Sequence, residues 1–415
     1  MLKFELVTRE KFKTMTKNKS MNYTCLFGGG AIRGTAYAGA ARAMEELGIT
    51  PTTLAGSSVG SVFAGLIAVG YTAEELESLF LKFNFEIFRD VQLSLGANFA
   101  LSKGEVFLDW IRDLIESKFY GDKYRKGKHK AVTFKDLDKN LVVITTDLSS
   151  FECKEFSKFE TPDFEIATAI RISCGMPGLM RPFEYNNRTL VDGDLQKSWP
   201  MWRLCETLSS LNENILEVRL EGSVCSNLNN PIHYANTVYS CITSIASDFV
   251  TEVYENDENH DCLVVNTGDV VIVDFQMKTA DRKALIRDGY EQTIEYFKNL
   301  LPVKKQKILD NYLKLKNYVF DIRENILGDN VEKAQIKYAN MLALLCQIGS
   351  MIDEKIYQDL QALSDEILNN SAKSLFLKRT YLQNTRKVLK DLDRLEEVLK
   401  AKCSKFETYF KLVKV

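Results

Sequence analysis

Residues 52–69 read TTLAGSSVGSVFAGLIAV and contain the most informative motif of the chain. The segment Thr52 to Ala55 is predicted to be a strand, and the apolar run Val59 to Val69 is predicted to be a helix. Between them stands Gly56-Ser57-Ser58-Val59-Gly60, a G-x-S-x-G pattern. A sharp strand-to-helix turn needs small residues two positions before and after its serine, because side chains there would collide with the neighbouring elements. The pattern therefore predicts a nucleophilic Ser58 at a helix N-terminus, although in isolation it would equally fit a Gly/Ser-rich helix cap.

A second glycine-rich segment lies upstream, again between a predicted strand and a predicted helix. It reads Gly28-Gly29-Gly30-Ala31-Ile32-Arg33-Gly34, after the strand-like run Tyr23 to Phe27 and before helical periodicity over residues 37–47. Glycines let backbone N–H groups approach a substrate oxygen, which favours an oxyanion hole at Gly28, Gly29 and Gly30. A phosphate-binding loop is the alternative, but the Lys-Ser/Thr ending of a P-loop is absent, and Arg33 occupies the third glycine position of a dinucleotide-binding fingerprint.

A carboxylate is the predicted general base. Val191-Asp192-Gly193-Asp194 follows the predicted strand Thr189 to Val191, and a carboxylate at a strand end followed by glycine can approach a serine hydroxyl closely. Because a carboxylate is a weak base for a serine proton, Asp192 would need a water-poor cleft and a nearby oxyanion hole. In isolation the Asp-Gly pair would indicate a hairpin turn. A Ser-His-Asp triad is the alternative, but no motif surrounds any of the three histidines, His129, His233 and His260.

Short apolar runs alternate with helical periodicity up to about residue 300, which predicts an α/β fold with a largely parallel sheet. Further strands are predicted at 141–146 and 262–265, and helices are predicted to open at the capping boxes Thr72-x-x-Glu75 and Ser102-x-x-Glu105. After Pro302 no further proline occurs, and Leu, Ile, Lys and Glu dominate, which predicts helices. The expected parts are an N-terminal extension at 1–20, a catalytic domain at 21–300 and an all-helical region at 301–415.

The helical region is interpreted as a packed bundle, with an oligomerisation or regulatory module as the alternative. Turns are predicted at Gly328-Asp329-Asn330 and Asn369-Asn370-Ser371. The last predicted helix carries five apolar residues spaced to bury one seam against a neighbour: Val388, Leu392, Leu395, Leu399 and Phe406. From Ser371 onward, twelve Lys or Arg residues stand against five Asp or Glu, an excess that would favour an anionic membrane surface or form a solvated face.

Composition excludes several classes of protein. The 415 residues are 45% hydrophobic and 27% charged with a formal net charge of −2, which fits neither a strongly basic nucleic-acid-binding protein nor a disordered one. The nine cysteines are scattered singly without a Cys/His cluster, so no metal or other cofactor is expected. The odd cysteine count and the polar first residues favour a reducing, cytoplasmic compartment. No run of about 18 apolar residues occurs, so the protein is expected to lie on a membrane rather than to cross it.

Taken together, the three motifs resemble the patatin-like phospholipase family in their order and spacing. Local similarity extends to Ser102-Lys103-Gly104, to Ile170 through Gly178 (IRISCGMPG) and to Asn266 through Phe275. The resemblance covers about residues 20 to 300 and leaves out the helical region. It implies a three-layer α/β sandwich and a calcium-independent lipid acyl hydrolase that forms an acyl-enzyme and releases a lysophospholipid and a fatty acid.

The resemblance also implies a role for each matching residue. Ser58 matches the nucleophile, Asp192 matches the base, and Gly28, Gly29 and Gly30 match the oxyanion loop. Arg33 would steady that loop or face a lipid phosphate. The remaining supporting positions are Gly34, Gly56, Gly60 and Gly193. Asp194 departs from the family, which usually has Gly or Ala there, and its carboxylate would either raise the pKa of Asp192 by like-charge repulsion or point outward.

A lipid substrate must leave a membrane, so an apolar rim is expected near the catalytic cleft. The aromatic-rich segment from Phe83 to Phe99 suggests a lid or interfacial patch, with ordinary core packing as the alternative. We expect a cytoplasmic protein that contacts membrane phospholipid peripherally, binds no nucleic acid, and is controlled through homo-oligomerisation or a partner at residues 303–415. Two other functions stay open: a lipid-binding or interaction module that works through its helical tail, and an esterase for non-lipid esters.

Overall fold

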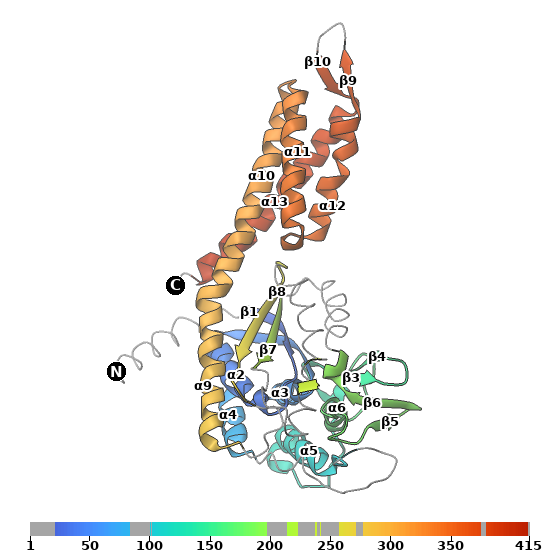
Figure 1. Ribbon diagram of the computed structural model, residues 1–415, viewed down its shortest axis with the longest axis vertical. Helices are drawn as coiled ribbons and strands as arrows, with labels where there is room; N and C mark the ends of the chain where they lie inside the picture. The colour runs from blue at the N-terminus through green and yellow to red at the C-terminus, as the bar shows by residue number, and fades with distance from the viewer. Residues whose placement is uncertain are drawn as a thin grey trace, which may run out of the picture. The chain divides into compact units, whose positions relative to one another are not determined.

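An eight-stranded, mostly parallel sheet is the centre of the first part of the chain (Figure 1). The computed structural model describes residues 21–83, 100, 102–196, 214–222, 237–238, 241, 257–270, 277–374 and 379–413. The strands are β1 (Met21–Phe27), β2 (Ile49–Ser57), β3 (Asn140–Asp147), β4 (Glu152–Ser157), β5 (Phe183–Tyr185), β6 (Arg188–Asp192), β7 (Ile215–Glu221) and β8 (His260–Asn266). Their order is β5-β6-β3-β2-β1-β7-β8, with β4 also paired to β3.

The pairing of the strands brings three chain segments together at one end of the strands. Strands β1, β2 and β3 run parallel, so the residues that follow β1 and β2 leave the sheet on the same side. Strand β6 runs antiparallel to β3 and pairs Asp192 with Thr145, while β2 pairs Ser57 with the adjacent Ile144. Because β3 lies between β2 and β6, it brings the end of β6 close to the turn that follows β2.

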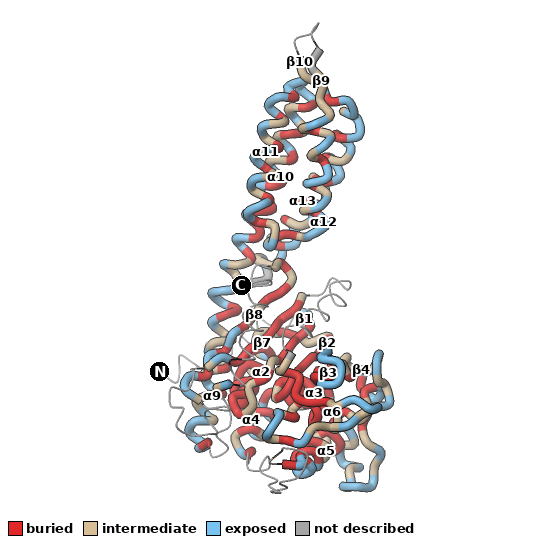
Figure 2. Tube along the Cα trace, turned by 45° about the vertical axis from the view of Figure 1, so that its right-hand side comes forward, coloured by how far each residue is buried: buried red, intermediate tan, exposed pale blue. Residues whose placement is uncertain are grey.

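Helices follow the parallel strands and pack against the sheet and one another. Among the described residues of this part, the α-helices are α2 (Ala36–Glu46), α3 (Val59–Ala68), α4 (Ala73–Lys82), α5 (Glu105–Tyr120), α6 (Ile166–Ser173) and α9 (Thr279–Glu295). Short 3₁₀ segments are η1 (Ala31–Thr35), η3 (Gly121–Lys123), η4 (Phe134–Asp136) and η5 (Gly193–Gln196). Figure 2 shows that β1, β2, β3, α2 and α3 are largely buried, which places the core around the elements that carry the glycine-rich motifs.

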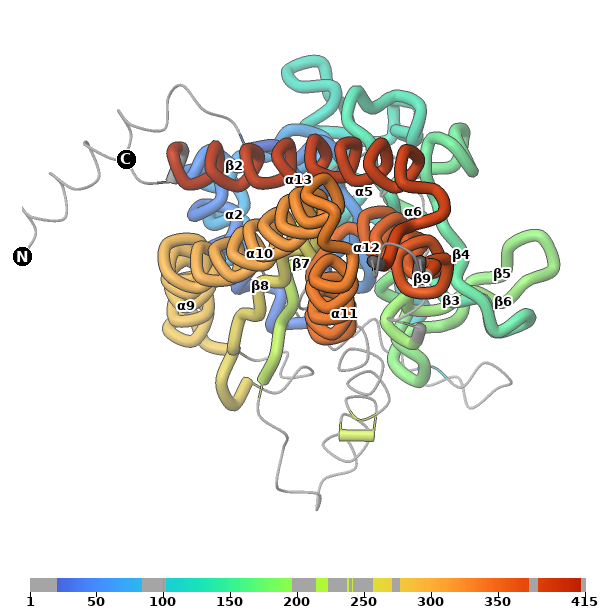
Figure 3. The backbone as a smooth tube through the Cα atoms, turned by 90° about the horizontal axis from the view of Figure 1, so that it is seen from above, coloured from blue at the N-terminus to red at the C-terminus, as the bar shows by residue number. Residues whose placement is uncertain are grey.

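The second part of the chain is mainly helical and has its own apolar core. It contains α10 (Leu301–Leu327), α11 (Val331–Ile348), α12 (Glu354–Ala362) and α13 (Thr385–Val413), with the short segments η7 (Gly349–Met351) and η8 (Asp365–Asn369). A hairpin of β9 (Ser371–Ser374) and β10 (Arg379–Leu382) is added to the predicted helices. Helix α10 packs against both α11 and α13, as Figure 3 shows from above. All five apolar residues of the predicted seam on α13 are buried in this core.

The chain divides into two compact units. The first holds the described residues up to 255 together with Asn259–Tyr296, and the second holds 257–258 together with the described residues from Phe297 onward. A π-helical segment, η6 (Tyr296–Leu300), lies at this division. Within the described ranges, no helix combines the length and apolar character that crossing a bilayer requires.

The predicted α/β architecture with a mostly parallel sheet and a helical region after it is confirmed. Strands occur at every predicted position, and the Thr72 capping box closes with both of its hydrogen bonds. The prediction of a capping box at Ser102 is wrong, because Gly104 in a left-handed conformation (φ 77°) is the N-cap of α5. The Ser102 hydroxyl instead accepts the Gly104 N–H at 3.0 Å.

Two predictions fall largely outside the described residues. The N-terminal extension, residues 1–20, and most of the predicted lid, residues 84–99, belong to this group. Of the lid segment, Phe83 is described and is buried, with its ring 4.4 Å from that of Trp110. Phe83 therefore serves in core packing.

Helices α2 and α9 approach each other through two glycines. A Cβ atom at Gly39 of α2 would overlap the carbonyl oxygen of Ile286, and one at Gly289 of α9 would overlap that of Ala36. These backbone atoms belong to helices and cannot yield separately, so both positions exclude a side chain.

Replacement of Gly39 by alanine is expected to lower the free energy of unfolding by ~1–3 kcal/mol, because the overlap outweighs a gain of ~1 kcal/mol in helix propensity. Denaturant unfolding of the full chain measures the change. The control is Glu291→Ala at an exposed position of α9, which should stay within ~0.5 kcal/mol of the wild type. A Gly39→Ala protein as stable as the control would show that the two helices do not pack this closely.

Candidate active site

Ser58 occupies a strained turn between β2 and α3. Its backbone has φ 50° and ψ −131°, a conformation that residues with a side chain rarely adopt. The turn is tight because a Cβ atom at Gly56 would overlap the Gly60 carbonyl, and one at Gly60 would overlap the Phe27 carbonyl. The two glycines of the G-x-S-x-G pattern are therefore required by backbone contacts, as the sequence pattern predicts.

The Ser58 hydroxyl meets the carboxylate of Asp192. Its Oγ donates to Asp192 Oδ2 at 2.8 Å, and both residues are buried, with exposed fractions of 6% and 0%. Asp192 ends β6 and is fixed from two sides. Its backbone N–H donates to Gly175 O at 3.1 Å, and its Oδ1 accepts the Asp194 N–H at 2.9 Å. The second carboxylate oxygen thus holds the first in place to face the serine.

Ser173, the last residue of α6, fixes the backbone of the serine turn. The Ser58 N–H donates to Ser173 Oγ at 2.9 Å, and the Ser173 hydroxyl donates to Ile144 O of β3 at 2.6 Å. The same residue therefore links the turn, helix α6 and the central strand. Sequence reasoning did not single out Ser173 as a functional residue, although it lies within the IRISCGMPG stretch that carried part of the resemblance.

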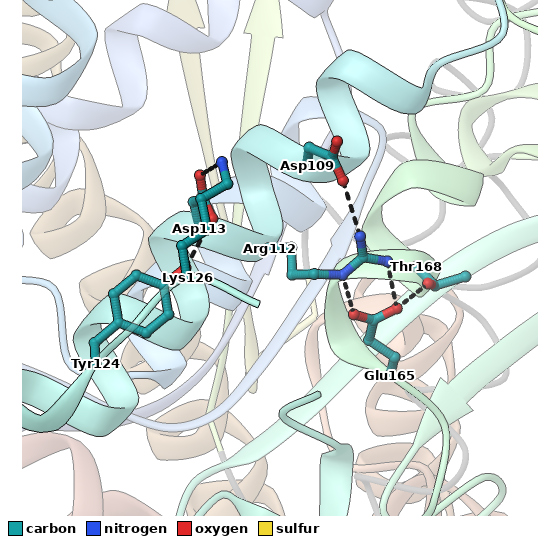
Figure 4. Close-up of polar contacts among 7 residues, drawn as sticks. All are labelled: Asp109, Arg112, Asp113, Tyr124, Lys126, Glu165 and Thr168. Atoms are coloured by element: carbon teal, nitrogen blue, oxygen red, sulfur yellow. Dashed lines mark hydrogen bonds and ion pairs between the residues drawn. The ribbon is translucent and has the colours of Figure 1, made fainter. Parts of the chain in front are cut away.

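The opposite end of α6 is held by an ion pair from α5. Figure 4 shows Arg112 of α5 paired with Glu165, the residue that precedes α6. Arg112 Nε donates to Glu165 Oε1 at 2.6 Å, and Arg112 Nη2 donates to Glu165 Oε2 at 3.0 Å. The Thr168 hydroxyl donates to the same carboxylate. A two-point guanidinium–carboxylate pair fixes direction as well as distance, so it helps to orient the helix that presents Ser173.

The three glycines of the loop after β1 play different parts. The Gly28 N–H donates to Val218 O at 3.1 Å and continues the sheet ladder, and the Gly29 N–H donates to Asp194 Oδ1 at 3.1 Å. Gly30 has φ 144°. In the described part of the chain, no acceptor lies against the Gly30 N–H. Of the three amides, that of Gly30 is the one these protein contacts leave available.

Tyr37 holds the same loop through its side-chain hydroxyl. Its hydroxyl donates to Gly28 O at 2.7 Å and to Val218 O at 3.1 Å. Burial, followed by the charge of Asp194, raises the pKa of Tyr37 well above its usual value, so it remains a neutral donor. In the sequence, Tyr37 stands out only as the first residue of the helical periodicity over residues 37–47.

Asp194 points into the protein and takes part in the hydrogen bonds of the site. It is 2% exposed, and its carboxylate accepts both the Ser57 hydroxyl and the Gly29 N–H. A Cβ atom on Gly29 would overlap this carboxylate. Of the two orientations that the sequence left open, the outward one is wrong: Asp194 joins the glycine loop to the serine turn.

The remaining supporting residues serve the close packing of the site. A Cβ atom at Gly34 would overlap the Val59 side chain, and one at Gly193 would overlap Ile144 O. Arg33 is 8% exposed, and its Nε donates to Val270 O at 2.7 Å. This contact ties the residue after the glycine loop to the segment that follows β8.

The described histidines make their contacts away from Ser58. His129 Nε2 lies 3.0 Å from Lys123 O, and its ring stacks on Tyr120. His260 Nε2 lies 3.1 Å from Glu217 Oε2 on β7. His233 lies outside the described residues. The partner that the structure gives the Ser58 hydroxyl is a carboxylate.

Cys174 is the other potential nucleophile next to this site. Burial, and then the charge of Asp192, raise the pKa of the Cys174 thiol well above its usual value. A thiol must ionise to react, so Cys174 is poorly suited to nucleophilic attack. Across the described ranges, no group of three or more His, Cys, Asp or Glu side chains is placed to hold a metal ion.

The chain is similar to several known proteins. Residues 26–200 match the family model described as patatin-like phospholipase, the family that the three motifs resemble. The match contains Ser58, Asp192 and the glycine-rich loop.

Several individual proteins are similar to the chain. YqhO of Bacillus subtilis is 25% identical over 297 residues, which are 66% of this chain and 97% of YqhO. The probable lipid hydrolase 463L of invertebrate iridescent virus 6 is 27% identical over 43% of this chain and 61% of its own length. The NTE family protein Rv1063c of Mycobacterium tuberculosis is 28% identical over 47% of this chain and 48% of its own length. The crystal structure of VipD from Legionella pneumophila aligns with 92% of this chain and 88% of VipD, at 16% identity and a TM-score of 0.49.

Alanine at Gly60 and alanine at Gly28 are expected to have opposite outcomes. At Gly60 the new methyl group overlaps backbone, whereas at Gly28 its nearest neighbours, Tyr37 Oη and Val218 O, lie 3.7 Å away. We expect Gly60→Ala to lower the free energy of unfolding by at least ~2 kcal/mol and Gly28→Ala to change it by less than ~1 kcal/mol. Denaturant unfolding compares them directly, and equal stabilities of the two variants would refute the tight elbow.

Proposed function

We propose that the protein is a lipid acyl hydrolase of the phospholipase A type. It cleaves an acyl ester of a glycerophospholipid and releases a free fatty acid and a lysophospholipid. The observation that carries this proposal is the 2.8 Å hydrogen bond from Ser58 Oγ to Asp192 Oδ2, on a strained elbow within a patatin-like phospholipase domain. The name of one relative, a probable lipid hydrolase, supports the substrate class.

The first half of the reaction transfers the acyl group to Ser58. Asp192 takes the hydroxyl proton as Oγ attacks the ester carbonyl carbon, and the carbonyl oxygen becomes an oxyanion. The tetrahedral intermediate then collapses, the ester C–O bond breaks, and the departing lysophospholipid oxygen takes the proton from Asp192. Because Asp192 is completely buried, little water competes for its carboxylate during the transfer.

The oxyanion needs donors that are already in place. We assign this role to the backbone amide of Gly30 and to that of Val59, the first residue of α3, because an amide directly after the nucleophile is a common oxyanion donor. Each such donor contributes roughly 100- to 1,000-fold in rate. The Gly28 and Gly29 amides, engaged by Val218 and Asp194, hold the loop in shape for this purpose.

The second half of the reaction frees the enzyme. A water molecule gives a proton to Asp192 and attacks the acyl carbon, and the second tetrahedral intermediate releases Ser58 Oγ, which recovers a proton as the fatty acid leaves. No cofactor takes part in this scheme. The two steps use the same serine, carboxylate and amides.

The setting that we propose for this reaction is the surface of a membrane. The phospholipid substrate resides in a bilayer, so the protein would bind membranes peripherally when active. We propose the cytoplasm as its location. The helical region at 303–415 buries its own apolar core and is proposed to bind a regulatory partner or a second copy of the chain.

Ser58→Ala and Asp192→Asn are expected to abolish hydrolysis without unfolding the protein. We expect losses of at least ~1,000-fold in kcat for each, because the nucleophile or the proton acceptor is removed. Mass spectrometry of fatty acid and lysophospholipid released from phosphatidylcholine and phosphatidylglycerol vesicles measures the loss. The matched control is Ser78→Ala at an exposed position of α4, which should retain full activity.

Each alternative function has its own signature in the same assay. Release of fatty acid by folded Ser58→Ala protein would contradict the proposed nucleophile. Wild-type protein that cleaves short soluble esters but no vesicle lipid would favour a non-lipid esterase. Wild-type protein that binds vesicles and cleaves neither would favour a lipid-binding module.

Asp194 and Gly29 are expected to be energetically coupled. In the wild-type background, Gly29→Ala places a methyl group on the Asp194 carboxylate and should lower kcat strongly. In an Asp194→Gly background the space is open, so the same change should cost less, with a coupling of roughly 1–3 kcal/mol. The double-mutant cycle is measured as kcat and KM on a soluble ester, together with unfolding free energies.

A positioning role predicts that Asp194→Gly lowers kcat while KM changes little, because the oxyanion loop loses its tie to Ser57. Additive effects of the two substitutions would show that Asp194 does not hold the loop.

A further inference from the structure

A cavity of about 700 Å³ lies beside the catalytic residues without including them. Its walls come from the start of α5, the end of β3, helix α6 with the loop after it, and the β5–β6 hairpin. The lining residues are Glu105, Leu108, Leu148, Arg171, Pro177, Gly178, Arg181, Pro182, Phe183, Glu184, Thr189 and Val191. The cavity is thus large enough for a small amphiphile and is not the cleft that holds Ser58.

Arg171 is a buried cation in the wall of this cavity. It is 4% exposed and lies on α6. Its Nη2 donates to two backbone carbonyls, that of Lys103 at 2.6 Å and that of Arg181 at 2.7 Å. Its Nη1 has no hydrogen-bond partner among the described residues. One arm of the guanidinium therefore fixes the side chain, and the other arm is buried without a hydrogen bond to the described protein.

The charge of Arg171 is not neutralised by the protein around it. Within the described part of the chain it forms no ion pair, and the two carbonyls that it binds carry no net charge. Burial lowers its pKa to about 10, which Glu105 partly opposes and Arg181 reinforces. Arg171 is consequently still protonated at neutral pH. A buried cation without an anion is costly, so an anion that enters the cavity gains a strong, poorly screened partner.

The remaining charges of the cavity leave this site open to an anion. Arg181 is an exposed second cation at the rim. Glu184 is exposed and accepts the Thr189 hydroxyl at 2.9 Å, and Glu105 is exposed as the first residue of α5. The acidic groups thus lie toward solvent, whereas the buried charge is positive.

Most other wall residues are apolar, and they define the rest of the ligand. Leu108, Phe183 and Val191 surround the space, and Leu148, 39% exposed, stands at its rim. A free inorganic ion would leave these surfaces uncovered, whereas an alkyl chain would cover them.

We propose that this cavity binds an amphiphilic oxyanion, with a carboxylate or phosphate head directed toward the Arg171 guanidinium and an alkyl body against the apolar wall. The site lies next to the catalytic residues along the chain, because Arg171 stands two residues before Ser173 and Val191 stands directly before Asp192. The proposal does not depend on hydrolysis by Ser58. A fatty acid and a lipid phosphate share the chemistry, and the probes below separate them.

Three probes with the same ten-carbon chain test the head group: decanoate, decyl phosphate and decanol. Calorimetric titration uses the full chain with Ser58→Ala, so that no turnover occurs. At least one anion should bind with one-to-one stoichiometry and roughly tenfold or more tighter than decanol. Stronger binding of decanoate identifies a fatty acid as the natural ligand, and stronger binding of decyl phosphate identifies a lipid phosphate. Equal affinity of all three probes would overturn the proposal.

Substitution of Leu148 locates the bound anion. In the Ser58→Ala background, Leu148→Glu places a carboxylate at the rim and should weaken anion binding roughly tenfold, whereas Leu148→Gln, similar in size but neutral, should change it less than about threefold. Leu148 is part of neither the proposed dyad nor the oxyanion loop, and its partial exposure allows both variants to fold.

Arg171→Lys keeps the positive charge but loses the planar guanidinium with its second nitrogen arm. It should therefore weaken the binding of the two anions and leave the affinity for decanol unchanged. If Arg171→Lys does not fold, the Leu148 pair decides the question. Anion binding that Leu148→Glu leaves intact would place the ligand elsewhere and refute the site.

Discussion

The hydrogen bond between Ser58 and Asp192 joins residues 134 positions apart, and strand β3 is what makes it possible. Strand β3 pairs in parallel with β2 on one side and antiparallel with β6 on the other. Its neighbouring residues Ile144 and Thr145 therefore set the levels at which Ser57 and Asp192 end their strands. Any slip of either pairing would separate the hydroxyl from the carboxylate, so the proposed chemistry depends on the register of the sheet.

The same region concentrates buried polar groups that would be costly without partners. Asp192 and Asp194 are 0% and 2% exposed, yet each carboxylate receives hydrogen bonds from the glycine loop, the serine turn or the backbone between them. Those hydrogen bonds offset the loss of water and also hold the loop and the turn at a fixed separation. The glycines follow from this arrangement, because the backbones at Gly29, Gly56 and Gly60 approach other atoms too closely for a side chain. A preformed site costs little reorganisation when charge develops on a substrate.

The parts of the site that sequence could predict are those determined locally. The glycine spacing of the elbow at Ser58 carries the information, because Gly56 meets Gly60 within the motif itself and any such turn beside a neighbouring strand needs both positions free of a side chain. The strands around it have strong apolar patterns, and their positions agree with the structure. The start of α5 was misplaced, because Gly104 adopts a left-handed conformation beside Met180, a contact that no local pattern records.

Other features depend on distant partners and could not be read from one segment. Ser173 accepts the Ser58 N–H, and Asp194 points into the protein. Both arrangements arise only when α6, β6 and the glycine loop come together in the fold. Strand β7 was also missed, although its pairing with β1 places Val218 against Gly28 and Tyr37. The unpaired arm of Arg171 likewise becomes visible only once the loop after α6 has wrapped around the side chain.

The proposed chemistry requires that Ser58 be an activated nucleophile paired with Asp192. Reaction of the full chain with a fluorophosphonate, followed by peptide mapping, tests it most directly, because the reagent forms a covalent bond only with an activated serine. We expect one modified peptide, containing residues 56–60 with the label on Ser58, and no labelling when Asp192 is replaced by asparagine. Stable labelling of a different residue, with Ser58 unmodified, would show that Ser58 is not the activated nucleophile.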